Sequence, residues 1–159
     1  MDFYFWRCLI MIIETIAAAF GTMGIAIIFN IRGKNLIYSA IGGGIGWLSF
    51  KILISLSVGK IGAMFIASLI ISMYSEACAR IFKCPVTTFV ISALIPLVPG
   101  GAMYYTMYEA VQGNLDTALY MTVDTIACAG SLAFGVIVVS TFLKIIKTAK
   151  TLIKKNLKN

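Results

Sequence analysis

Long apolar stretches dominate the chain, and short polar gaps separate them. Five stretches are long enough to cross the hydrocarbon core of a bilayer, which takes about 20 residues of α-helix. They are Cys8–Phe29, Leu36–Val58, Ile61–Ala79, Val86–Val111 and Thr117–Leu143. The gaps hold two to six residues, as expected between antiparallel neighbours. The pattern predicts an all-α integral membrane protein of about five transmembrane helices, with residues 1–143 forming one membrane domain.

The fourth stretch is interrupted near its middle by the run Ile95-Pro96-Leu97-Val98-Pro99-Gly100-Gly101. Each proline removes a backbone donor and clashes with the preceding turn, and the freed carbonyls need partners in protein or a water-lined cavity. A second half-helix would begin around Gly100 near the midplane of the bilayer. Its free amide groups and positive dipole end would suit an anionic substrate group. The alternative is an ordinary proline kink packed by neighbouring helices.

Positive charges are distributed unevenly over the gaps and the C-terminus. With the N-terminus outside, ten lysine and arginine residues lie on the cytoplasmic side and two on the outer side, while Lys51 lies inside the second span. The positive-inside rule therefore predicts an outer N-terminus and a cytoplasmic C-terminus. Residues 144–159 alternate lysines with apolar residues at helical spacing. This tail is predicted to be a basic amphipathic helix on anionic lipid of the inner leaflet, or simply a topology anchor.

Three charged residues are predicted to lie at one depth inside the membrane. Counting along each helix places Glu14, Lys51 and Asp124 about 9–10 Å below the outer boundary. Intramembrane charges normally pair or line a water path, so Lys51 is expected to pair with Asp124 or with Glu14. The remaining carboxylate is a candidate for proton coupling; side chains reaching outward to the interface are the alternative. Glu76 and Glu109 are interpreted as hydrated residues near the membrane surfaces.

Composition excludes several other function classes. The chain is 60% apolar and 12% charged, its formal net charge is +7, and it contains no histidine. The four cysteines show no C-x-x-C spacing, so we expect no metal site, no cofactor and no hydrolytic enzyme. The positive charges are confined to gaps and the tail, which argues against nucleic acid as a partner. The run Gly42-Gly43-Gly44-Ile45-Gly46 is interpreted as a close helix-packing surface.

Two segments resemble a known transporter family. The first is Ala19-Phe20-Gly21-Thr22-Met23-Gly24-Ile25-Ala26-Ile27-Ile28-Phe29-Asn30, followed by a basic turn and the glycine-rich span. The second is Val90-Ile91-Ser92-Ala93-Leu94-Ile95-Pro96-Leu97-Val98-Pro99-Gly100-Gly101, followed by a tyrosine-rich stretch. Together they resemble the threonine/serine exporter family, specifically the short subunit of its two-gene form, over nearly the whole chain.

The resemblance implies a bacterial inner-membrane exporter of small carboxylated metabolites, either threonine and serine or a dicarboxylate such as succinate. It also implies coupling to the proton-motive force and a separately encoded longer subunit as partner. The predicted substrate-binding residues, most of them family-motif positions, are Asn30, Pro96, Pro99, Gly100 and Gly101. A structural or assembly subunit that does not touch substrate is the alternative function.

Overall fold

The computed structural model describes residues 2–156, with side chains described for residues 6–146, 148 and 149. Within that range the chain is helical and contains no strand. The helices are α1 (Asp2–Ile28), α2 (Lys34–Ser55), α3 (Lys60–Phe82), α4 (Thr87–Leu94), the 3-10 turn η1 (Ile95–Leu97), α5 (Gly100–Val111) and α6 (Leu115–Asn156).

Four of these helices are long and apolar enough to cross a membrane. The qualifying segments are Trp6–Ile28, Lys34–Ser55, Lys60–Phe82 and Leu115–Ile146. A fifth span results if Thr87–Leu97 and Gly100–Val111, which are bent by 49° at their junction, count as one. The prediction of an all-α chain with about five spans is therefore confirmed at the level of four to five candidate helices.

Glycines bring α2 close to its neighbours on two sides. A Cβ atom at Gly43 would overlap the Thr22 side chain of α1, and one at Gly46 would overlap Ile71 of α3. A Cβ at Gly42 would lie 2.9 Å from the Tyr74 ring. Because these positions carry no side chain, the backbone of α2 lies directly against α1 and α3.

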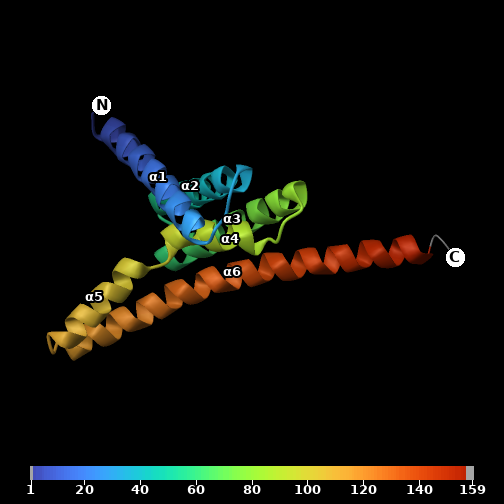
Figure 1. Ribbon diagram of the computed structural model, residues 1–159. Helices are drawn as coiled ribbons and strands as arrows, with labels where there is room; N and C mark the ends of the chain where they lie inside the picture. Colours follow the sequence, from blue (N-terminus) through green and yellow to red (C-terminus); the bar gives the residue numbers. More distant parts are fainter. Residues whose placement is uncertain (1, 157–159) are drawn as a thin grey trace.

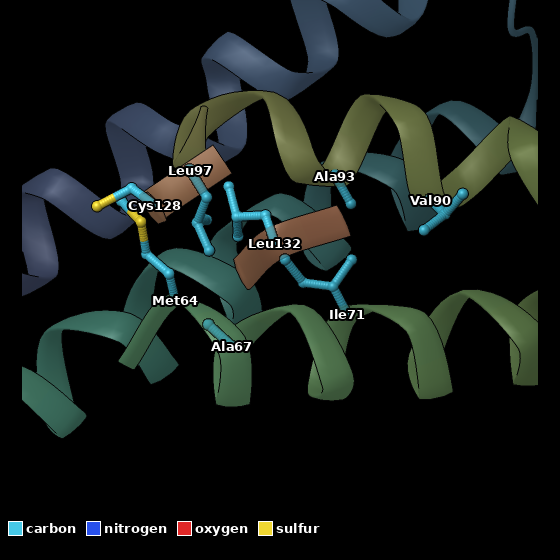
Figure 2. Packing of buried hydrophobic residues seen from close by; sticks show 8 residues of the cluster. All are labelled: Met64, Ala67, Ile71, Val90, Ala93, Leu97, Cys128 and Leu132. Atoms are coloured by element: carbon cyan, nitrogen blue, oxygen red, sulfur yellow. The ribbon is translucent and has the colours of Figure 1, made fainter. Parts of the chain in front are cut away.

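The main apolar core lies between α3, α4, η1 and α6, as Figure 2 shows. Its buried members are Met64, Ala67, Ile71, Val90, Ala93, Leu97, Cys128 and Leu132. Ile71 is the twelfth of the 23 residues of α3, and Leu97 packs in the same cluster. The bend that follows Leu97 therefore lies about halfway along α3.

Helix α5 and the first turns of α6 form a hairpin that extends away from this core (Figure 1). Gly113, in the turn between them, has a φ of 85°, a conformation that glycine adopts without a Cβ clash. Helix α5 packs mainly on α6, and none of its residues is buried. In Figure 1, α1 and this hairpin diverge on the same side of the molecule.

Two predictions for the end of the molecule that is expected to be cytoplasmic have different outcomes. Glu76 was expected to be a hydrated surface residue, but it is only 8% exposed, and Leu143 of α6 lines a pocket with it. The tail is a direct continuation of α6 as far as Asn156. Its contact with lipid remains a prediction, and Leu157 and Lys158 lie outside the described residues.

Candidate functional site

The break between η1 and α5 is set by two prolines. Val98 leaves the helical region, with φ −56° and ψ 118°, because the ring of a following proline disfavours a helical conformation in the residue before it. Pro99 then forms the N-cap of α5, and no side chain caps the amide groups of that helix. The first hydrogen bond of α5 runs from Met103 N–H to the Pro99 carbonyl. The amides of Gly101 and Ala102 therefore precede the regular hydrogen-bonding pattern of the helix.

A cavity of about 320 Å³ lies beside this break, and we call it the break cavity. It is lined by Trp47, Phe50, Lys60, Met64, Pro96, Leu97, Val98, Pro99, Gly101 and Ala102. A second cavity of about 270 Å³ adjoins it, because Trp47 and Pro96 line both, and Glu14 lines the second. Pro96, Pro99 and Gly101, all predicted substrate-binding residues, thus share one hollow with a lysine ammonium and two aromatic rings.

Glu14 and Lys51 form an ion pair across α1 and α2. The Lys51 Nζ atom lies 2.7 Å from Glu14 Oε2, and both side chains are about one third exposed. Trp47 Nε1–H donates to the same carboxylate oxygen at 3.3 Å, and the Lys51 ammonium lies 5.6 Å from the Trp47 ring centroid. The indole therefore orients the pair, and it also lines the break cavity.

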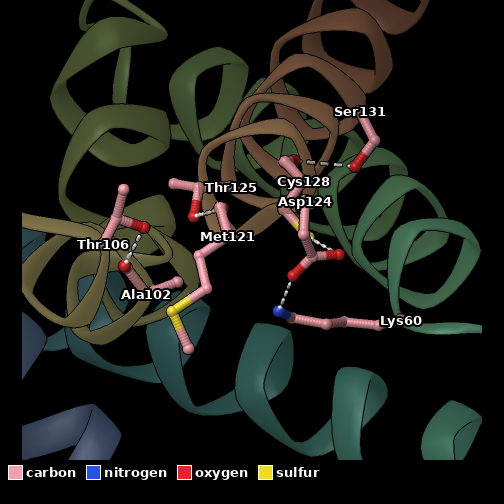
Figure 3. Close-up of polar contacts among 8 residues, drawn as sticks. All are labelled: Lys60, Ala102, Thr106, Met121, Asp124, Thr125, Cys128 and Ser131. Carbon is pink, nitrogen blue, oxygen red and sulfur yellow. Dashed lines mark hydrogen bonds and ion pairs between the residues drawn. The ribbon is translucent and has the colours of Figure 1, made fainter. Parts of the chain in front are cut away.

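Asp124 pairs with Lys60 and not with Lys51. Its Oδ2 atom accepts a hydrogen bond from Lys60 Nζ at 2.7 Å, whereas Lys51 pairs with Glu14. Figure 3 shows Lys60 extending from the start of α3 toward Asp124 on α6. The Cys128 thiol lies 4.0 Å from the other carboxylate oxygen. Of the two pairs expected for Lys51, the one with Glu14 is present. The alternative with Asp124 is not, because Asp124 lies beside Lys60, the first residue of α3.

Two predicted residues lie apart from the break cavity lining. Asn30 ends α1 in the left-handed region with φ 58°, and its Oδ1 atom accepts a hydrogen bond from Arg32 Nε at 2.9 Å. It is 16 residues from Glu14, about 24 Å along a helix. Gly100 bonds through its amide to the Val98 carbonyl and is not among the cavity-lining residues. Asn30 is therefore positioned as a helix-ending residue, for which asparagine is well suited.

Sequence reasoning missed Lys60 and Trp47. Lys60 was counted as a charge in a two-residue gap, although it begins α3 and lines the break cavity. Trp47 precedes Lys51 by one helical turn, a spacing that places both side chains on one face of α2. That spacing was a usable signal. The position of Lys60 in the sequence indicated less, because its contact with Asp124 depends on α3 running beside α6.

In chemical terms, the site offers positive groups around a partly apolar hollow. The Lys60 ammonium and the α5 amides are hydrogen-bond donors, and both suit a carboxylate. Trp47 and Phe50, whose ring centroids lie 5.9 Å apart, supply apolar walls. Among the described residues, no three His, Cys, Asp or Glu side chains gather as a metal site.

Comparisons with known proteins agree with the membrane architecture. Residues 14–142 match the family model described as "Threonine/Serine exporter, ThrE". An uncharacterized protein of Haemophilus influenzae is 27% identical over 99 residues, which cover 62% of this chain and 33% of that protein. The chain thus spans about a third of the length of the curated relative that it matches. No solved structure matches it. Because the family match covers 129 of its 159 residues, the chain is a multi-pass membrane protein that belongs to the threonine/serine exporter family.

Proposed function

We propose that this chain is the short membrane subunit of a secondary exporter for small carboxylated metabolites. The candidate cargoes are threonine and serine, or a dicarboxylate such as succinate. The observation that carries the proposal is the break cavity, where the start of α5 and Lys60 line one hollow. We place this site near the midplane of a fourth span formed by α4, η1 and α5, in a bacterial inner membrane. A separately encoded longer subunit would complete the transporter.

A carboxylate fits the donors of the break cavity. The Gly101 and Ala102 amides lie in the first turn of a 12-residue helix, where the unpaired N–H groups and the helix dipole favour negative charge. The Lys60 ammonium supplies a full positive charge from the other wall. Neither group requires a particular substrate side chain, so the same site suits a hydroxy amino acid or a dicarboxylate.

Proton coupling follows from the competition for Lys60. The Lys60 ammonium lies 2.7 Å from Asp124, so this carboxylate already has a cationic partner. A substrate carboxylate that binds Lys60 would weaken this pair and allow Asp124 to take up a proton. Asp124 is therefore our candidate coupling residue, and the Glu14–Lys51 pair is assigned to holding α1 against α2.

Two glycine variants test the cavity. Gly101→Leu fills the space beside the first turn of α5, where an added Cβ would meet no atom within 4 Å, so insertion should be normal. We expect it to abolish efflux from cells preloaded with threonine-releasing or serine-releasing peptides, with succinate efflux measured separately. Gly130→Leu is the matched control, because this glycine lies exposed on α6 with equally open surroundings. Wild-type efflux from the Gly101 variant would refute binding at this cavity.

The orientation proposal has its own test. Cys8 is exposed and Cys84 is half-buried, whereas Cys78 and Cys128 are buried. In single-cysteine variants, an impermeant thiol reagent should label Cys8 from outside intact cells and Cys84 only after the cytoplasmic face is opened. Cys128 serves as the unlabelled control. Labelling of Cys84 from outside would reverse the topology and place the N-terminus on the cytoplasmic side.

The second candidate function is a structural or assembly subunit that does not contact substrate. None of the residues of α5 is buried, which favours it, because such a surface is available to a partner membrane protein. Reconstitution of each subunit alone and of both together decides between the two functions. If the longer subunit alone transports at the full rate, this chain is accessory.

A further inference from the structure

A separate cavity lies between α1 and α2, and we call it the α1–α2 cavity. Its volume is about 180 Å³, and it is lined by Arg7, Ile10, Met11, Glu14, Lys51, Ile54 and Ser55. None of these residues lines the break cavity. Arg7 and Lys51 are cations and Glu14 is a carboxylate, so the lining carries one positive charge in excess. The α1–α2 cavity therefore favours a negatively charged ligand.

The α1–α2 cavity lies where two candidate membrane spans end on the same side. Arg7 is the second residue of the span Trp6–Ile28, and Ser55 is the last residue of the span Lys34–Ser55. Both residues line the same cavity, so the start of α1 lies beside the end of α2. The polar headgroup region of a bilayer begins at this level, where the hydrocarbon core ends. The two cations are therefore close to the depth of phospholipid phosphates.

The apolar part of the cavity lining is open to the surroundings of the protein. Ile10 and Ile54 line the cavity, and both are exposed. Only 6% of the apolar part of the α1 span is buried inside the protein, so most of this helix faces lipid or a partner. A ligand that fits the cations and the isoleucines together carries a negative group on an apolar tail.

The two cations have enough donors for such a ligand. A lysine ammonium has three N–H donors, and Lys51 directs one of them to Glu14 Oε2 at 2.7 Å. An arginine guanidinium has five donors in a planar fork, so it binds two oxygens of one phosphate and keeps other partners at the same time. The hydroxyl of Ser55 already donates to the Ile52 carbonyl at 2.7 Å. Arg7 and Lys51 are thus the groups that would hold a phosphate.

We propose that the α1–α2 cavity binds the phosphate of a membrane phospholipid. The phosphate accepts hydrogen bonds from Arg7 and Lys51, and an acyl chain follows Ile10 and Ile54 on the lipid-facing side of the two helices. A soluble anion would use the cations but not the apolar wall, so the lining favours a lipid. The inference does not depend on the exporter function or on the orientation of the chain, because both leaflets of a bilayer contain phospholipid.

The ion pair between Glu14 and Lys51 provides the sharpest test. Lys51→Gln removes a cation that holds the phosphate, whereas Glu14→Gln removes the carboxylate that competes with the phosphate for the same ammonium. The two variants should therefore change lipid binding in opposite directions. If the pair only holds α1 against α2, both variants lose the same contact and change lipid binding in the same direction.

The measurement is a lipid titration of the full-length protein. Purified protein in a neutral detergent is titrated with phosphatidylglycerol, and bound lipid is counted by native mass spectrometry. We expect Arg7→Gln and Lys51→Gln each to weaken binding by about tenfold, the scale of one charge-assisted hydrogen bond. Glu14→Gln should strengthen binding by about fivefold, the scale of one charge beside an anionic headgroup. Diacylglycerol with the same acyl chains, which lacks the phosphate, should bind weakly to all of these proteins.

The matched control is Lys34→Gln. Lys34 is the first residue of α2, so it lies at the other end of the helix that carries Lys51, and its variant should bind phosphatidylglycerol as the wild type does. Lys51→Arg keeps the positive charge and should recover most of the binding lost in Lys51→Gln. Should Lys51→Gln fail to fold, Arg7→Gln and Glu14→Gln provide the same comparison, because Arg7 is exposed at the start of α1.

Several results would overturn the proposal. Equal losses for Lys34→Gln and Lys51→Gln would indicate a general attraction of lipid to basic residues. Weaker binding in Glu14→Gln would make the ion pair a packing contact only. Displacement of the lipid by an equal concentration of inorganic phosphate or succinate would assign the α1–α2 cavity to a soluble anion. Equally tight binding of diacylglycerol would leave the phosphate without a role.

Discussion

Glycines serve opposite purposes in α2 and at the start of α5. In α2, a Cβ atom at Gly43 would lie 2.7 Å from the Thr22 Cβ, and one at Gly46 would lie 2.7 Å from the Ile71 Cγ1. At Gly100 and Gly101 an added Cβ would meet no atom within 4 Å. The α2 glycines therefore allow helices to touch, whereas the α5 glycines leave space open beside the backbone.

This difference distinguishes the helices around α2, whose close packing stabilises the fold, from the start of α5, which is available for binding. Close helix contact is the main source of stability between membrane helices, because lipid removes the hydrophobic drive that acts in water. The α2–α3–α4 region contains those contacts. The α5–α6 hairpin lacks them on its outer faces, so changes there should affect substrate or partner binding more than folding.

The strongest test of this comparison is Gly43→Leu set against Gly24→Leu. Both glycines lie inside helices, but only Gly43 lies against another side chain, since a Cβ at Gly24 meets nothing within 4 Å. We expect Gly43→Leu to destabilise the protein by about 3 kcal/mol or to prevent its accumulation, because overpacking forces backbone shifts. Thermal unfolding in detergent measures the difference. Equal melting temperatures for the two variants would show that α1 is not held against α2 in the folded protein.

A smaller effect is expected from breaking the two ion pairs. Lys60→Ala leaves Asp124 a contact with the Cys128 thiol at 4.0 Å, whereas Lys51→Ala leaves Glu14 its hydrogen bond from Trp47. The side chains of both pairs are about 30–44% exposed, so each lysine should contribute about 1 kcal/mol or less to folding. Efflux should fall much further for Lys60→Ala than for Lys51→Ala. Equal efflux in the two variants would remove Lys60 from the binding site.

The broad architecture was predictable because a bilayer imposes one dominant rule. Helices must satisfy their backbone groups internally and be about 20 residues long, so the apolar stretches alone located four of the long helices. The break at Pro99 was also readable, because proline acts locally on the residue before it. Both features depend on sequence neighbours and not on packing.

The partners of the charged residues were less predictable. Counting residues assumes that every helix is upright and starts at the same membrane boundary. Helix α6 instead begins about nine residues before it reaches the first residue of α3, so Asp124 contacts Lys60. The burial of Glu76 depended on the same neighbour, since Leu143 of α6 lines a pocket with it. Asn30 was assigned from family resemblance to the substrate site, yet its contacts are those of a turn. Each of these outcomes depends on how helices are placed relative to one another, which periodicity does not encode.

The smallest effect on folding is expected for Gly101→Ala, at the start of α5, where the backbone has open space beside it. The added methyl meets no atom, and alanine is a better helix former than glycine by about 1 kcal/mol, an advantage that is reduced in the first turn. The melting temperature should therefore stay the same or rise slightly, while Gly46→Ala, the same change against Ile71, should lower it. Thermal unfolding of both variants in one detergent measures the contrast. A clear loss of stability in Gly101→Ala would mean that α5 is covered in the folded protein, and the break cavity would then be a packing interface and not a site open to substrate.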